Sequence, residues 1–225
     1  MIPEPGSGQT SSSWRTLPPA GYGSPMSLKL DSYGLAQHGE VLATRATGRD
    51  VGREVAQRLA DSRGLLLNFH GVDVASPAFL FELITAIRAT LLAPPAHWLL
   101  VTGMNDDVRE SAGLVLERLK MVLGVLENDE IELLGGSEHL QDTIKAAQQL
   151  EVFTAPDLAR ELELKLPALH QRLNQLVEAG VLSRQDDPTA KRGKRSKFAT
   201  PPIAQATDAD DRHETGEFAA ITVNC

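Results

Sequence analysis

The feature that limits the fold most is a pair of short apolar runs, each followed by a helical pattern. "GLLLNF" (residues 64–69) and "HWLLVTG" (97–103) are each bounded by glycine or polar residues. Runs of this kind are typical of strands that are buried on both faces. The segments that follow them, 76–92 and 105–126, have the length and apolar content of helices. Strands that alternate with helices predict the α/β class, with one sheet.

The neighbouring segments continue this alternation. Residues 27–34 and 42–45 are interpreted as short strands, 48–62 as a helix, 130–135 as a last strand and 137–151 as another helix. Ser76 followed by Pro77 is a favoured order for a helix start. We therefore predict one sheet domain over residues 26–136, followed by a linking helix over 137–150.

The two ends of the chain have little to bury. Residues 1–25 are rich in proline, glycine and serine, and residues 202–225 carry five acidic side chains against Arg212 alone. Both compositions predict disorder. Met26 precedes the first strand pattern, which makes it a candidate for the true start of translation.

Composition excludes several classes of protein. The single cysteine, Cys225, allows no internal disulfide, and the six histidines are scattered, so no metal or other cofactor is expected. Neither a secretory signal nor an apolar stretch of about 18 residues is present, which predicts a soluble, cytoplasmic protein without membrane contact. The net charge of −8 argues against a surface that binds nucleic acid everywhere. A local basic patch remains compatible with it.

Residues 151–201 have a different organisation. Two short helical patterns, 154–164 and 166–179, precede Gly180, which stands where a glycine commonly ends a helix. The strand patterns 181–185 and 197–200 follow, joined by the polar loop "DDPTAKRGKRS". Two helices with a tight turn and then a hairpin predict a small winged helix-turn-helix domain.

Such a domain would bind DNA with its second helix and its basic loop. Amide and guanidinium groups can read base edges in the major groove, and lysine and arginine neutralise phosphates. A winged helix used only for protein contacts is the alternative. The residues predicted to contact DNA are His170, Gln171, Arg172, Asn174 and Gln175 on the helix, and Lys191, Arg192, Lys194, Arg195 and Lys197 in or beside the loop.

About 50 residues of this unit carry a family resemblance. "TAPDLARELELKLPALHQRLNQLVEAGVLSRQ" and "RGKRSKFATP" resemble the winged helix-turn-helix domains of bacterial transcription regulators. The resemblance implies DNA as a partner. A homodimer is a plausible assembly, because such operators are often palindromic.

The first unit resembles another group. Thr44-Arg45, "LLLNFHGVDVASPAFLFEL" (65–83) and "LLVTG" (99–103) are similar to STAS-like domains of unknown function, related to anti-sigma factor antagonists. The resemblance implies a small sheet with packed helices. It also implies a protein partner, such as a kinase-like ATPase, bound at the loop and helix after the central strand. The residues placed there are Asp73, Ser76, Phe79 and Glu82.

Ser76 has two interpretations. In the switchable antagonists this helix start reads Asp-Ser-Ser-Gly, and an ungapped alignment puts Pro77 at the phosphorylated serine. Asn68 also replaces the usual aspartate at the strand end. Ser76 is therefore interpreted as a helix cap, with a regulatory phosphosite as the alternative.

Two functions follow from the sequence. The first is a transcription regulator in which the STAS-like domain senses or binds a partner and the winged helix binds DNA. The second is a protein-interaction adaptor, without enzymatic activity, in a partner-switching or defence system. The sequence has no nucleophile and base pattern and no phosphate loop with its lysine, so we expect no enzyme. "LGGS" (134–137) could cradle an anion before a helix, but two glycines are a weak signal and a plain strand-to-helix turn is the favoured interpretation.

Overall fold

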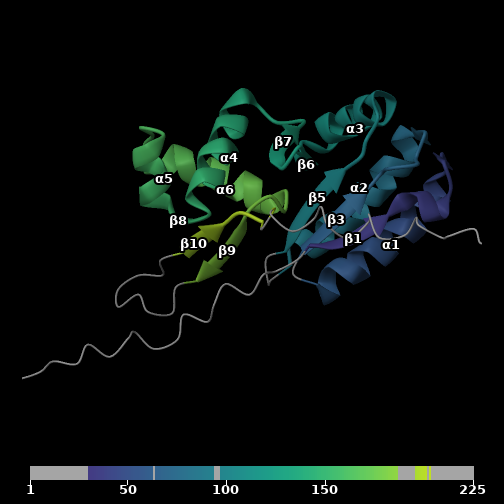
Figure 1. Ribbon diagram of the computed structural model, residues 1–225, viewed down its shortest axis with the longest axis horizontal. Coiled ribbons are helices and arrows are strands. Elements are labelled where there is room, and N and C mark those ends of the chain that lie inside the picture. The colour runs from purple at the N-terminus through teal and green to yellow at the C-terminus, as the bar shows by residue number, and fades with distance from the viewer. Residues whose placement is uncertain (1–29, 63, 94–96, 187–195, 202, 204–225) are drawn as a thin grey trace, which may run out of the picture.

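The fold is built around a five-stranded sheet with the order β1-β3-β5-β6-β7. The computed structural model describes residues 30–62, 64–93, 97–186, 196–201 and 203. Strands β1 (Asp31–Gly34), β3 (Gly64–Asn68), β5 (Trp98–Thr102) and β6 (Leu123–Glu127) are parallel, and β7 (Glu130–Leu134) is antiparallel to β6 (Figure 1). The α/β class predicted from the alternation is confirmed.

Three helices cover one face of this sheet. They are α1 (Arg45–Asp61), α2 (Pro77–Leu91) and α3 (Asp106–Leu119). Their apolar side chains form one core with alternate residues of the central strands, such as Leu65 and Leu67 of β3. A short 3-10 helix, η1 (Leu35–His38), and a separate parallel pair, β2 (Val41–Leu42) with β4 (Val74–Ala75), complete this side.

The prediction of one helix over residues 105–126 is wrong beyond Leu119. Lys120 takes the left-handed conformation (φ 52°) and ends α3, and residues 123–127 form strand β6, which lies between β5 and β7 in the sheet. The sequence "KMVLGVL" is apolar after its lysine, and a short apolar run fits a buried strand as well as a buried helix. A short strand at Val152–Thr154, β8, was also missed.

The C-terminal elements lie on the other side of the sheet (Figure 1). In order they are α4 (Glu138–Leu150), β8 (Val152–Thr154), α5 (Ala155–Glu161), α6 (Leu166–Glu178), β9 (Ser183–Asp186) and β10 (Ser196–Ala199). The three strands form an antiparallel sheet with the order β8-β10-β9. The predicted leader over residues 1–25, the tail from 204 and the loop 187–195 lie outside the described residues.

The second face of the main sheet and the C-terminal elements form a single hydrophobic cluster. Leu66, Trp98 and Leu100 of the sheet belong to the same buried cluster as Leu173 and Leu176 of α6. A parallel sheet needs cover on both faces, and here the second cover is the C-terminal unit. The boundary predicted at residues 136–137 therefore does not separate two hydrophobic cores.

Gly180 lies directly against strand β5 of the main sheet. Its carbonyl accepts a hydrogen bond from the backbone N–H of Leu99 at 2.8 Å. Its φ is +71°, and a Cβ at this position would lie 3.0 Å from the Leu99 nitrogen. Only glycine meets both the left-handed backbone and the close approach without strain. The indole N–H of Trp98 makes a second link by donating to the carbonyl of Ala199 at 3.3 Å.

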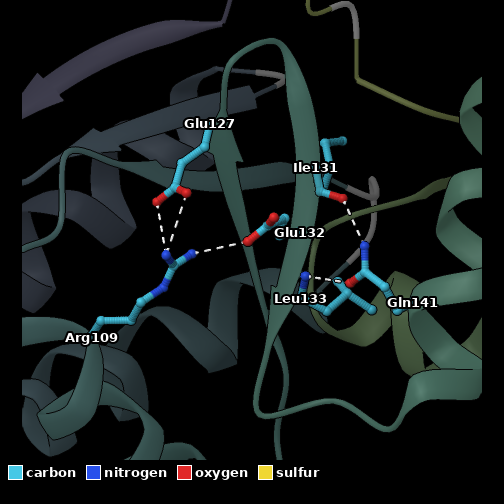
Figure 2. A network of polar contacts seen from close by, with 6 residues as sticks. All are labelled: Arg109, Glu127, Ile131, Glu132, Leu133 and Gln141. Carbon is cyan, nitrogen blue, oxygen red and sulfur yellow. Dashed lines mark hydrogen bonds and ion pairs between the residues drawn. The ribbon is translucent and has the colours of Figure 1, made fainter. Parts of the chain in front are cut away.

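The outer edge of β7 is closed by a side chain of α4. Gln141 accepts a hydrogen bond from the backbone N–H of Leu133 at 2.7 Å and donates to the carbonyl of Ile131 at 3.3 Å (Figure 2). This amide satisfies two backbone groups of β7 that a neighbouring strand would otherwise bind. Arg109 of α3 pairs with Glu127 of β6 and Glu132 of β7 (Figure 2). Among the described residues, none of the helices has the length and apolar character needed to cross a membrane.

Candidate nucleic-acid interface

Helix α6 has one buried stripe and one exposed polar face. Leu169, Leu173 and Leu176 are fully buried against the second core. Residues three and four apart share a helix face, so this stripe directs the intervening residues outward. Four of the five helix residues predicted to contact DNA are exposed: His170, Gln171, Asn174 and Gln175.

Arg172 has another role. Its guanidinium is half-buried and donates to the carbonyl of His139 and to the hydroxyl of Thr143, both at 3.3 Å. These contacts hold α6 against α4, on the side away from Asn174. This position gives Arg172 a role in helix packing, and its predicted contact with DNA stays a prediction.

A hollow of about 430 Å³ lies beside the exposed face of α6. Leu166 and His170 of α6 line one side, and Arg184 and Ser196 of the β9–β10 hairpin line the other. Arg184 is exposed, and its Nε donates to the hydroxyl of Ser196 at 2.9 Å. The sequence analysis did not single out Arg184. Its place near the end of the strand predicted at residues 181–185, just before the basic loop, was the signal that could have found it.

Asp157 of α5 also lines this hollow. The hydroxyl and the backbone N–H of Thr154 donate to its carboxylate, at 2.5 and 3.2 Å. These hydrogen bonds stabilise the charged form and hold the pKa of Asp157 below its usual range. Asp157 therefore stays negative at neutral pH and contributes a negative charge to the lining of the hollow.

The basic loop is only partly within the structure. Lys191, Arg192, Lys194 and Arg195 lie outside the described residues. The described residues do fix where the loop leaves and returns, because Asp186 of β9 pairs with Ser196 of β10. Lys197 lies on β10, is half-buried and is paired in register with Gln185 and Thr154.

The partner site predicted on the first unit is only partly at the surface. Asp73 is exposed in the loop before α2. Phe79 is 0% exposed and packs in the core under α1 and α2, so the prediction that it contacts a partner is wrong. Glu82 is 19% exposed and forms ion pairs with Arg45 and Arg49 of α1, at 3.8 and 3.4 Å. Its charge is therefore used within the fold.

Ser76 has the geometry of a helix cap. Its Oγ accepts a hydrogen bond from the backbone N–H of Phe79 at 3.1 Å and donates to the carbonyl of Ala43 at 2.6 Å. The hydroxyl thus ties the start of α2 to the segment before α1. Its hydrogen is committed to Ala43, and a phosphoryl group on this oxygen would remove that bond.

We expect Ser76→Ala to lower the free energy of unfolding by about 1–2 kcal/mol, because the cap and the bond to Ala43 are both lost. Ser76→Thr keeps the hydroxyl and is the matched control. Urea denaturation monitored by circular dichroism measures both variants. Equal stability of Ser76→Ala and the natural chain would contradict the role as a cap.

An apolar groove that the sequence analysis missed lies next to this helix start. It has a volume of about 320 Å³ and runs between α2 and α3, over Phe81 and Leu114. Leu114 is 58% exposed, which is unusual for a large apolar side chain. Arg45 and Arg118 also line the groove, and Arg118 lies over the ring of Phe81. The surface combines apolar area with positive charge.

No cluster of three or more histidine, cysteine or carboxylate side chains suited to a metal ion occurs among the described residues. Comparisons of the chain with protein-family models, with curated proteins and with solved structures find no match.

Proposed function

We propose that this chain is a DNA-binding transcription regulator, in which α4 to β10 form a winged helix and α6 enters the major groove. The observation that carries the proposal is the exposed amide face of α6 beside a hairpin whose loop is basic in sequence. Strand β8 lies between α4 and α5, β9 and β10 follow α6, and the three strands form one antiparallel sheet. This order of helices and strands is the one expected of a winged helix.

The dimensions of α6 suit this role. Its 13 residues correspond to a length of about 20 Å, and the major groove admits a single helix. Gln171 and Asn174 lie on its outer face, and amide side chains form paired hydrogen bonds with adenine edges. Their neighbour Glu178 adds a negative charge at the end of the same face. Attraction to phosphate must therefore come mainly from the hairpin side.

The test separates base reading from packing. We expect Gln171→Ala and Asn174→Ala to reduce the discrimination between a selected site and a mismatched site by about 1–3 kcal/mol each. The site is obtained by selecting bound fragments from genomic DNA, and affinities are measured by gel shift at one stated salt concentration. Gln149→Ala removes an exposed amide from α4 and is the matched control. Unchanged discrimination in both variants would exclude α6 as the reading helix.

A second candidate function is supported by the groove between α2 and α3. The exposed Leu114, with Arg45 and Arg118 beside it, favours a protein partner that presents an apolar side chain and a carboxylate. In this interpretation the first unit is a STAS-like interaction domain and the chain is an adaptor, with a kinase-like ATPase as one partner. This function would be favoured over the first by two results together. The chain captures a defined ATPase and Leu114→Asp abolishes the capture, and the chain enriches no DNA fragments.

A further inference from the structure

A cavity of about 290 Å³ lies where the first unit meets the C-terminal unit. Four segments that are far apart in sequence contribute to it: the end of α2, the turn from α3 to β6, the turn from β7 to α4, and the end of α6. Its polar side chains are Arg88, Lys120, Ser137, Gln175 and Glu178. The volume is near the lower limit for ligand sites in proteins, so the cavity suits a small molecule.

Two positive charges face this cavity from the first unit. Arg88 lies in the last turn of α2, and Lys120 is the residue that ends α3. Within the part of the chain that the structure describes, neither side chain forms an ion pair or a hydrogen bond. Two cations with no protein carboxylate bound to them are available to an anion that enters the cavity.

The remaining groups would recognise the rest of such a ligand. Gln175 and Glu178, one turn apart on α6, offer an amide and a carboxylate that can bind hydroxyl or amino groups. Ser137 precedes α4, and its hydroxyl makes no bond to the helix that it begins. The backbone of Gly136 and the start of α4 add partial positive charge on the same side, as a secondary contribution.

We propose that this cavity binds a small phosphorylated molecule that also carries hydroxyl groups, of the class of sugar phosphates and nucleoside monophosphates. Arg88 and Lys120 bind the phosphate, and Gln175 and Glu178 bind the hydroxyl-bearing part. The bound molecule joins α2 and α3 of the first unit to α4 and α6 of the second. This site goes beyond the proposed DNA binding, and its occupancy is measured without DNA.

The phosphate backbone of DNA is another anion that Arg88 and Lys120 could meet, because Gln175 also belongs to the outer part of α6. The hollow shape favours the small molecule. A duplex presents a convex row of phosphates, whereas four segments surround this cavity and place an acid, Glu178, on one wall. DNA contact is treated as an outcome of the test that contradicts the proposal.

The test is isothermal titration of the full chain with four probes: inorganic phosphate, ribose 5-phosphate, AMP and adenosine. We expect at least one of the two phosphate esters to bind at least tenfold more tightly than inorganic phosphate and adenosine. Tighter binding of AMP indicates a nucleotide, and equal binding of both esters indicates a sugar phosphate. The double variant Arg88→Gln/Lys120→Gln is expected to weaken the ester at least tenfold.

The matched control is Arg53→Gln/Lys145→Gln. It also removes two exposed positive charges, from α1 and α4, and neither residue lines the cavity. It is expected to bind the ester as the natural chain does, and circular dichroism verifies that both double variants are folded. The proposal is overturned if neither ester binds more tightly than inorganic phosphate, or if the cavity variant and the control weaken ester binding equally. It is also overturned if the cavity variant binds the ester as the natural chain does but loses affinity for DNA in a separate gel shift.

Discussion

Replacement of Lys191, Arg192, Lys194 and Arg195 by glutamine is expected to abolish most of the salt dependence of DNA binding. Each phosphate that a lysine or arginine neutralises contributes about 0.9 to the slope of log affinity against log salt. Four lost contacts therefore lower the slope by about 3.6. Between 50 and 200 mM salt, a contribution of this size to the slope corresponds to roughly a 150-fold loss of affinity. The natural chain would show this loss and the variant would not.

The charge distribution makes this effect large. The whole chain has a net charge of −8, and the exposed face of α6 carries Glu178 but no lysine or arginine. In the described part of the C-terminal unit, Arg184 is the cation that lines the hollow beside α6. Few other groups can therefore replace the loop, and affinity at about 100 mM salt is expected to fall by roughly two orders of magnitude or more.

The control for this experiment is a variant with the same loss of charge on the first unit. Arg45, Arg49, Arg53 and Arg118 lie on α1 and α3. Replacing them by glutamine removes one exposed ion pair, the two pairs of the partly buried Glu82, whose arginine partners are exposed, and one ring contact. Exposed ion pairs contribute little to stability, so this chain is expected to fold. Gel shifts of both quadruple variants at four salt concentrations give the two slopes. Equal slopes would show that overall charge, and no local contact of the loop, drives the binding.

The sequence predicted the elements whose patterns are long or whose ends are marked. Helix α2 begins at Pro77 after the Ser76 cap, as the order of these residues indicates, and α3 begins after Asn105. The leucine stripe of α6 predicted which of its residues are buried. These features depend on neighbours within a few turns, which a local pattern records.

The parts that were missed depend on contacts between distant segments. Strand β6 has apolar residues on both faces. Val125 packs in the core under α1, α2 and α3, and Leu126 packs in the core shared with the C-terminal elements. Arg172 resembles an exposed residue in the sequence, and only the position of α4 shows that its guanidinium has partners at His139 and Thr143. Phe79 was assigned to the surface because the resemblance to STAS-like domains implies a partner at this loop and helix, whereas the helix turns Phe79 into the core.

Trp98→Ala is expected to lower the free energy of unfolding by about 3–5 kcal/mol, because a large buried side chain is removed. Trp98 is 6% exposed and belongs to the cluster that joins the sheet to the C-terminal unit. The substitution also removes the hydrogen bond from the indole to the carbonyl of Ala199. Since domains are stable by about 5–15 kcal/mol, this loss is a large share of the total.

The manner of unfolding distinguishes a shared core from two independent ones. If the cluster that contains Trp98 unites both units, urea denaturation of Trp98→Ala shows one transition, and hydrogen exchange accelerates equally in α1 and α6. Trp98→Phe, which keeps most of the apolar volume, is expected to lose less stability, and Leu114→Ala at an exposed position less than about 0.5 kcal/mol. Faster exchange confined to α5 and α6, with α1 unchanged, would instead show that the C-terminal unit unfolds by itself. In that case a ligand or partner could release it from the sheet, because local unfolding would then cost less than unfolding of the whole chain.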